Sequence, residues 1–509
     1  MQQSGSSSVG SDEERAREPA AEAADHVSER TPDASSDGTE LPDEPTAAAG
    51  STAVRGSKWR AVDVLRRVWV AIVLVIVGSG YLGYATYSHS DALSPIDEWV
   101  YVDYLLKVPD QGIVRQGEDV GTAAREIISC DGLQAYGRQG AECGADYADD
   151  SGYPYQGKTT ADAYTPIYFQ VTYWTTKAIQ AVSGEDFIDA ARLTSVIWLD
   201  IGLVLLVVLM RRFKIPDLMI LAAGLVIIGS PYAWWTYSYI GTDAPTLALA
   251  CVVTYCALGV MQGRSRGWWF IGWSVLATLV KVTNIFAVGL GVLLILLGWF
   301  FRWRVERRAG RSTPPLAPVW IALGAAGLAI GLEAAWLVIR GAIAVGPIPD
   351  QEGLSALGIA ELISQSTNFI EGALSSNVVL SGTSALTYAY PIPTGYVRPL
   401  AWIGALAVIG SLLAARASWQ RQALRWSTAL AAVAFPPVLA VVMTLSQGYY
   451  FVLPSRYGAA LIPIYFVLLG LLMRNRILQV ILGVYGTGLI FWGIGFASFY
   501  WGSQFGYHP

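Results

Sequence analysis

Long apolar runs separated by short basic loops dominate the chain after residue 67. Each run approaches the ~20 residues with which a helix crosses the hydrocarbon core of a bilayer. We therefore predict an all-α integral membrane protein with about 11 transmembrane helices. The predicted spans cover residues 68–86, 190–210, 218–231, 244–261, 268–280, 285–301, 319–344, 400–415, 429–445, 459–473 and 478–498.

Basic side chains give these spans an orientation. Several precede the first span, which predicts a cytoplasmic N-terminus because positive charge stays inside. With alternating crossings, every short cytoplasmic loop then carries at least two basic residues, and the C-terminus is extracytoplasmic. The expected location is the cytoplasmic (plasma) membrane. The residues before the first span are Arg55, Lys58, Arg60, Arg66 and Arg67.

Two polar stretches on the predicted outer side are long enough to hold chemistry. The first outer loop, 90–189, contains two segments, 97–108 and 164–182, that we predict as juxtamembrane helices. Counting 164–182 as a full crossing would place the basic residues after the next span outside, so we assign it to the interface. The second outer loop covers residues 346–396.

Composition separates an N-terminal tail from the membrane domain. The chain is 53% hydrophobic and 14% charged with a mean hydropathy of +0.43, whereas soluble proteins carry about 25% charged residues. Residues 1–50 hold twelve acids and three arginines, a balance of −9. The total of −5 therefore leaves +4 for the remainder. We predict a disordered acidic cytoplasmic tail at 1–66 and a membrane domain at 67–509.

Few side chains suggest metal chemistry. Cys130 and Cys143 lie in the first outer loop, where an oxidising compartment would allow a disulfide between them. A metal site there is less favoured, because the loop holds no histidine to complete one. No Walker-type loop is present. The cofactor is therefore left open, with a divalent metal not indicated, and no nucleic-acid partner is expected.

Two adjacent carboxylates, Asp97 and Glu98, follow the first span. Acids at the start of a helix are stabilised by the helix dipole, which alone accounts for the pair. The alternative is a general base, because sugar transfer to a hydroxyl needs a carboxylate that takes up the proton. Asp103, near the opposite face of the same predicted helix, is expected to be solvated.

Three more polar residues lie at predicted outer ends of spans. Asp243 is either an N-cap ahead of Pro245 or a member of the same pocket as Asp97. Lys281 either snorkels to the interface or binds a lipid phosphate. Arg456 carries a planar guanidinium that matches phosphate oxygens bidentately.

Further candidates have simpler explanations. Asp200 and Glu333 fall within predicted spans, where ionisable residues tend to face a cavity or a partner. Arg192 is either an interfacial anchor or a pocket member. Aromatic side chains of the first outer loop offer faces for sugar stacking: Tyr153, Tyr155, Tyr164 and Trp174.

Several stretches, in this order, resemble the GT-C class of polytopic glycosyltransferases. That class includes protein O-mannosyltransferases, lipid A aminoarabinose transferases and actinobacterial arabinosyl- and mannosyltransferases. The stretches are 94–98 (SPIDE), 164–168 (YTPIY) with 190–195 (AARLTS), 241–245 (GTDAP) and 281–284 (KVTN). Arg456 with Tyr457 is similar to the late outer-face arginine of the class.

The resemblance implies an inverting transfer from a polyprenyl-phosphate sugar to a glycan, lipid or protein acceptor of the cell envelope, on the outer face of the membrane. It implies Asp97 as the base, with Glu98 as the alternative. Lys281 and Arg456 would hold the donor phosphate. The remaining pocket candidates are Asp243, Tyr164 and Arg192.

Two departures from the class limit what the resemblance implies. No C-terminal soluble carbohydrate-binding domain is expected, and Trp99 and Val100 stand where some members have a histidine after the acidic pair. The alternative function is a transporter or flippase of a lipid-linked or polar solute, with Asp200 and Glu333 on its pathway. No internal repeat supports that alternative, and a catalytically silent scaffold is a third class.

Overall fold

The computed structural model describes residues 56–88, 91–134, 136–347, 357–376, 394–414, 418–447, 450 and 452–500. The chain divides into two compact units, Met1–Trp59 and Arg60–Pro509, and the second is the subject below. Most of the predicted tail, 1–66, and parts of the second outer loop, 346–396, lie outside the described residues.

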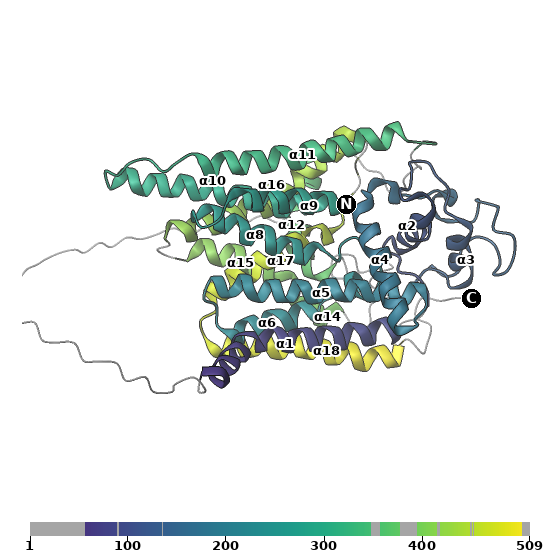
Figure 1. The fold of residues 1–509 in the computed structure, drawn as a ribbon, viewed down its shortest axis with the longest axis horizontal. Helices are drawn as coiled ribbons and strands as arrows, with labels where there is room; N and C mark the ends of the chain where they lie inside the picture. Colours follow the sequence, from purple (N-terminus) through teal and green to yellow (C-terminus); the bar gives the residue numbers. More distant parts are fainter. Residues whose placement is uncertain are drawn as a thin grey trace, which may run out of the picture. The chain divides into compact units, whose positions relative to one another are not determined.

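Helices form the membrane domain (Figure 1). Isolated bridges of extended backbone occur in the first outer loop, for example between Leu93 and Leu133. The α-helices are α1 (Gly56–Ser88), α2 (Glu98–Gln111), α3 (Thr122–Cys130), α4 (Pro166–Ser183), α5 (Phe187–Arg212), α6 (Asp217–Ile228), α7 (Pro231–Tyr237), α8 (Thr246–Met261), α9 (Gly267–Val280), α10 (Ile285–Arg308), α11 (Ala317–Ala342), α12 (Ile359–Ser375), α14 (Thr394–Val397), α15 (Pro399–Leu413), α16 (Trp419–Gln447), α17 (Ile462–Leu472) and α18 (Arg476–Tyr500). Short 3-10 helices are η1 (Pro154–Gly157), η2 (Ala161–Ala163), η3 (Val282–Asn284) and η4 (Ser455–Leu461).

The apolar runs of the sequence coincide with these helices. Among the described residues, eight helices are long and apolar enough to cross a membrane. The bent pair of α6 and α7 passes the same test together, while α8 and α9 are apolar but shorter. The chain is thus an all-helical membrane protein, and the number and orientation of its crossings stay predictions. α4 is not among the candidate spans, in agreement with its assignment to the interface.

One predicted span, 218–231, is interrupted before its end. α6 stops at Ile228, and α7 leaves at an angle of 62°. Pro231 begins α7, where its missing N–H costs nothing, and Ser230 caps the new helix by accepting from the backbone N–H of Ala233 (3.2 Å). Beyond the bend, the chain runs through Ile240 and Asp243 into α8.

The first outer loop folds into a compact helical layer. α2 packs against α3 and α4, and these three helices gather at the right-hand end of the long helices (Figure 1). The rings of Tyr104 and Phe169 stack at 3.8 Å between α2 and α4. A disulfide joins Cys130 and Cys143 in the same layer. The layer supports one face of the site described below.

Asp103 shows how completely α2 is enclosed. Only 1% of this residue is exposed, so the expectation of a solvated side chain was wrong. Its carboxylate accepts from Nζ of Lys107 (2.8 Å) and from the backbone N–H of Gly121 (2.7 Å). Burial raises the pKa of Asp103, and Lys107 opposes that rise. This burial could not be predicted from the sequence around Asp103, because the segment that covers it, around Gly121, lies outside the predicted helix.

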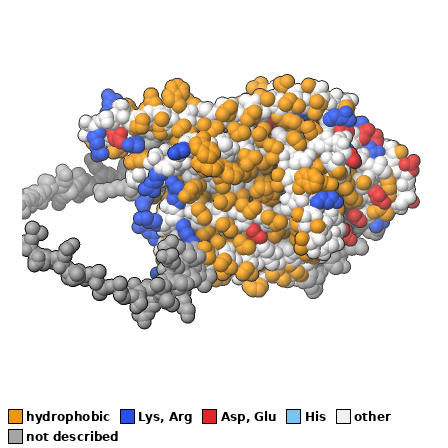
Figure 2. Space-filling model, viewed as in Figure 1, with side chains coloured by type: hydrophobic (Ala, Val, Ile, Leu, Met, Phe, Trp, Pro, Cys, Tyr) orange, Lys and Arg blue, Asp and Glu red, His pale blue; other side chains and the backbone are white. Residues whose placement is uncertain are grey.

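Charge is distributed unevenly over the face in Figure 2. Lys and Arg side chains gather at its left-hand end, while most of its Asp and Glu lie at the right-hand end. Hydrophobic side chains cover the surface between them. Such an apolar band between polar ends fits a surface that faces lipid.

Candidate active site

Four charged side chains from distant parts of the chain meet beside the first outer loop. Nη2 of Arg456 donates to Oδ2 of Asp97 (3.0 Å). Nζ of Lys281 donates to Oδ1 of Asp243 (2.6 Å), and Nε of Arg456 lies 3.3 Å from Oδ2 of the same carboxylate. Two carboxylates and two cations balance, so the cluster is formally neutral.

Neither Asp97 nor Asp243 uses its side chain to cap a helix, so both carboxylates are available to this cluster. Asp97 precedes α2 in the left-handed conformation (φ 58°) and makes no side-chain cap. Such a conformation is strained for a residue with a Cβ and is frequent at functional sites. Pro245, rather than Asp243, occupies the N-cap position of α8, also without a side-chain cap. Asp243 therefore does not cap α8, and its side chain lies with Lys281 and Arg456 instead.

Lys281 lies in an extended break between α9 and η3. It is 2% exposed, so it does not snorkel to the interface. The rings of Tyr164 and Tyr457 lie 5.9 Å and 5.4 Å from its ammonium group, close enough for cation–π attraction. Burial lowers the pKa of Lys281, and the charge of Asp243 opposes that change.

Arg456 is the second residue of η4, which begins at Ser455. Its Nε is buried and has no aligned hydrogen-bond acceptor among the described residues, although Oδ2 of Asp243 attracts it at 3.3 Å. A buried donor without an acceptor is costly and calls for an explanation. The cluster therefore has spare donor capacity at Arg456.

Hydroxyl groups line the cluster between α2 and the segment that opens α4. The hydroxyls of Tyr101 and Tyr164 are 3.0 Å apart, and Oγ1 of Thr242 donates to the hydroxyl of Tyr101 (3.2 Å). Burial raises the pKa of both tyrosines, so both stay protonated near neutral pH. Tyr101 and Tyr457 were not among the predicted site residues. Both had a sequence signal: Tyr101 is one helical turn after Asp97, and Tyr457 adjoins Arg456.

Exposure falls from one side of the cluster to the other. The side chain of Asp97 is 40% exposed, those of Arg456 and Asp243 are 13% and 10% exposed, and that of Lys281 is 1% exposed. A solute from water therefore meets Asp97 first, with the two cations behind it.

Glu98 has a different environment from its neighbour Asp97. It is fully buried, and its carboxylate accepts from Nε and Nη2 of Arg192 (2.9 and 3.2 Å). It also accepts from the backbone N–H groups of Ser94 (2.6 Å) and Ile240 (2.9 Å). Its acceptor sites are filled, so Glu98 ties α2, α5 and the chain after α7 together. Arg192 is correspondingly buried behind the cluster rather than placed at the interface.

The other candidates do not join the cluster. Asp200 accepts from Ser79 of α1 (2.6 Å), whereas Glu333 lies on α11, which packs on α9 and α10. The structure thus places these two acids on separate parts of the domain. Tyr153 is buried and bonded to Ser129 (2.9 Å).

The aromatic candidates also separate. Trp174 is 66% exposed on α4, and Tyr155 stacks on Trp99 with centroids 6.0 Å apart. Of the predicted aromatic set, Tyr164 alone lies against the four-charge cluster. Within the part of the chain that the structure describes, no three His, Cys, Asp or Glu side chains gather as a metal site would require.

Comparison with known proteins gives distant likenesses. No family model and no curated protein matches the chain. One similar solved structure is the Archaeoglobus fulgidus oligosaccharyltransferase tethered with an acceptor peptide containing the NVT sequon, with 12% identity and a TM-score of 0.38. The match covers 87% of this chain and 55% of that chain. Another is ArnT from Cupriavidus metallidurans in the apo state, with 14% identity and a TM-score of 0.36. That match covers 88% of this chain and 78% of the ArnT chain.

Both proteins are glycosyltransferases of the GT-C class that the sequence resembles. The chain spans 55% of the length of the oligosaccharyltransferase and 78% of that of ArnT. Likeness at this level is too distant to carry a function across, which must be inferred from the side chains of the site.

Proposed function

We propose that this protein is an inverting glycosyltransferase that moves a sugar from a polyprenyl-phosphate donor to a cell-envelope acceptor on the outer face of the plasma membrane. One observation carries the proposal: two cations, the buried Lys281 and the 13% exposed Arg456, converge on the carboxylate of Asp243 beside the more exposed Asp97. That arrangement suits an anionic leaving group behind a general base.

The donor phosphate is assigned to the two cations. An ammonium has three donor hydrogens and a guanidinium five, and Asp243 and Asp97 use few of them. Phosphate oxygens can therefore bind without displacing Asp243, which holds both cations in place. The buried Nε of Arg456 would gain the acceptor that it lacks.

In the transfer step, we assign uptake of the acceptor hydroxyl's proton to Asp97. The acceptor hydroxyl oxygen forms a bond to the anomeric carbon as the bond from that carbon to the phosphate oxygen breaks. The bonding electron pair leaves with the phosphate, whose charge Lys281 and Arg456 stabilise. The hydroxyl proton passes to the carboxylate of Asp97, the most exposed group of the cluster.

Asp97 is preferred to Glu98 as the base. Every acceptor site of Glu98 is occupied by Arg192 or backbone N–H groups. Asp97 has one partner, Arg456, and its Oδ1 has no hydrogen bond from the described residues.

The test uses the purified full chain in liposomes with a panel of radiolabelled polyprenyl-phosphate sugars and a crude envelope acceptor. Acceptor-dependent release of polyprenyl phosphate is measured for the parent and for Asp97→Asn. We expect the variant to lose about 100-fold or more in rate, because a positioned base contributes 10²–10⁴-fold.

Asp110→Asn is the matched control, since Asp110 is an exposed acid on the same helix and lies outside the cluster. It should keep the parental rate. Release by Asp97→Asn at the parental rate would remove Asp97 as the base. No release with any donor, together with movement of a labelled lipid across the bilayer, would replace the enzyme by a flippase.

A further inference from the structure

The predicted inner end of α10 concentrates arginine. Four guanidinium groups fall within its last two turns. Arg302 pairs with Glu306 (2.7 Å), but no carboxylate among the described residues pairs with Arg304, Arg307 or Arg308. Like charges three and four residues apart on a helix repel each other. An anion bound between them would relieve that repulsion.

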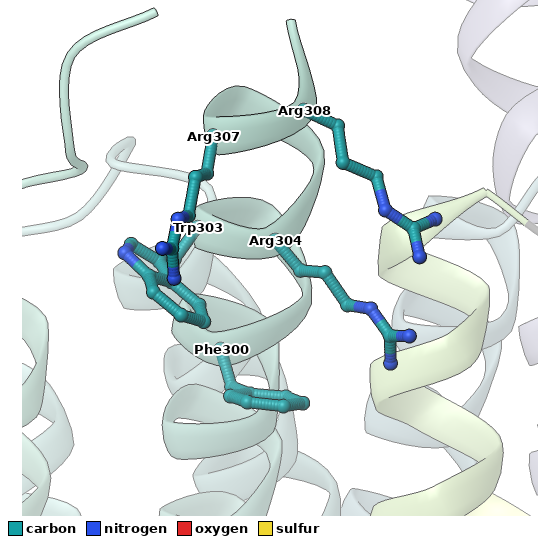
Figure 3. A pocket seen from close by; sticks show the side chains of 5 residues that line it. All are labelled: Phe300, Trp303, Arg304, Arg307 and Arg308. Carbon is teal, nitrogen blue, oxygen red and sulfur yellow. The ribbon is translucent and has the colours of Figure 1, made fainter. Parts of the chain in front are cut away.

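These side chains border a hollow of about 510 Å³ at the surface (Figure 3). Arg304 and Arg308 extend to the same side of α10, and Phe300 lies one turn below Arg304 on that side. Arg307 lies instead against the ring of Trp303, with 5.3 Å from its guanidinium carbon to the ring centroid. Phe300 is 40% exposed. The hollow thus combines a cationic rim with an apolar floor.

Positive charge on the inner side is expected of any membrane protein. That rule explains the number of arginines, but it does not explain the hollow that they border. Arg211, also after a predicted span, binds Asp217 (2.9 Å), and Arg212 binds Gln262 (2.9 Å). Compared with those two, Arg304 and Arg308 present their donors to the surroundings.

We propose that Arg304 and Arg308 bind the phosphate of an anionic lipid headgroup, with the lipid's acyl chain along Phe300. Two forked guanidiniums match phosphate oxygens, and aromatic rings at the same level suit the membrane interface. α10 begins beside Lys281 and ends at these arginines. The lipid site is therefore at the opposite end of this helix from the proposed active site, and it does not depend on the proposed reaction.

Native mass spectrometry of the detergent-solubilised full chain tests the proposal. The protein is titrated with phosphatidylglycerol or with phosphatidylcholine. We expect tighter binding of phosphatidylglycerol, and a loss of about tenfold or more in Arg304→Gln/Arg308→Gln, because the two guanidinium groups assigned to the phosphate are removed. Arg304→Lys/Arg308→Lys keeps the charge without the fork and should bind with intermediate affinity.

The matched control is Arg264→Gln/Arg266→Gln, which removes the same charge between α8 and α9. It should change phosphatidylglycerol binding by less than about twofold. Equal losses in the two double variants, or no preference for phosphatidylglycerol in the parent, would overturn the site. Inorganic phosphate that displaces phosphatidylglycerol at equal concentration would overturn the lipid as ligand and leave a free-anion site.

Discussion

Asp97 and Glu98 are neighbours in sequence with opposite environments. Asp97 precedes α2 in a left-handed conformation, whereas Glu98 is the first residue of the helix, so the adjacent acids point to different surroundings. Glu98 points into the domain and meets Arg192, while Asp97 points to the opening of the cluster. Substitutions of the two acids should therefore have different effects on stability and activity.

Glu98→Gln should reduce stability more than activity per folded molecule. It leaves the fully buried guanidinium of Arg192 without its counter-charge, which costs about 3–5 kcal/mol for a buried pair. Thermal unfolding of the purified chain in detergent measures the loss. Asp97→Asn, at a 40% exposed side chain, should melt close to the parent. Equal melting temperatures for both variants would contradict the structural assignment of Glu98.

Lys281 should give the reaction an alkaline limit. Phosphate binding needs the protonated ammonium, and burial lowers the pKa of Lys281. Donor use should therefore decline, as pH rises, at a lower pH than an ordinary lysine would give. Lys281→Arg should move the decline to higher pH, since a guanidinium stays charged. A decline at the same pH in both forms would assign it to another group.

At this scale, the sequence singled out all four charged residues of the cluster, but not which side chains pair with each other. Asp97, Asp243, Lys281 and Arg456 stood out because each is polar at the end of an apolar run. Which acid is buried could not be read from the sequence, since the partner of Glu98 lies 94 residues away.

Among the elements, the segment before α4 links the first outer loop to the long helices. Oδ2 of Asp162 accepts from Nε of Arg340 on α11 (2.6 Å), and the carbonyl of Ala163 accepts from Trp336 (3.3 Å). Thr165 donates to the carbonyl of Leu279, at the end of α9. Tyr164 lies between these anchors, so they fix its ring beside Lys281.

Arg340→Gln should weaken donor use without touching the cluster. Release of Asp162 lets the ring of Tyr164 shift, and misplacement by about 1 Å can cost up to ~100-fold; we expect about tenfold in kcat/KM. Arg340→Lys, which keeps the ion pair, should recover most of the rate. An unchanged kcat/KM together with a lower melting temperature would make the contact a purely structural one.

The disulfide between Cys130 and Cys143 is a second contact that stabilises the first outer loop. Cys130 and Cys143 close a loop with a sequence separation of 13, for which loop-closure entropy predicts about 3 kcal/mol of stabilisation. Cys130→Ser/Cys143→Ser should therefore lower the melting temperature, and a reductant should lower that of the parent but not that of the variant. Insensitivity of the parent to reductant would mean that the bond adds nothing to stability.

Apolar runs predicted the helices well, because twenty lipid-facing residues leave little choice of structure. The same signal missed the bend at Pro231 and the depth at which α2 is enclosed. Both depend on contacts with segments remote in sequence. Periodicity along one helix does not record such contacts.

The whole molecule has a charge asymmetry that predicts its orientation. Basic groups gather at one end and the site lies toward the other, beside α2 and α4. Ser183→Cys at the end of α4 and Ala309→Cys after α10, each in a Cys251→Ala/Cys256→Ala background, should report on opposite faces of the membrane.

A membrane-impermeant maleimide should label Ser183→Cys in intact cells, and Ala309→Cys only after permeabilisation. We predict an outer position for the end of α4, because Arg211 and Arg212 in the last turn of α5 are expected on the cytoplasmic side. The reverse labelling pattern would mean that the topology is inverted and that the site faces the cytoplasm.

The balanced charge of the four-residue cluster has a kinetic consequence if the proposed reaction is correct. A donor phosphodiester carries one negative charge, whereas the spent carrier is a monoester with a charge of about −1.5 to −2. Lys281 and Arg456 would then hold the product more tightly than the substrate. Free carrier left in the membrane would then occupy the site and inhibit the enzyme, so activity would depend on how fast the surrounding membrane is cleared of spent carrier.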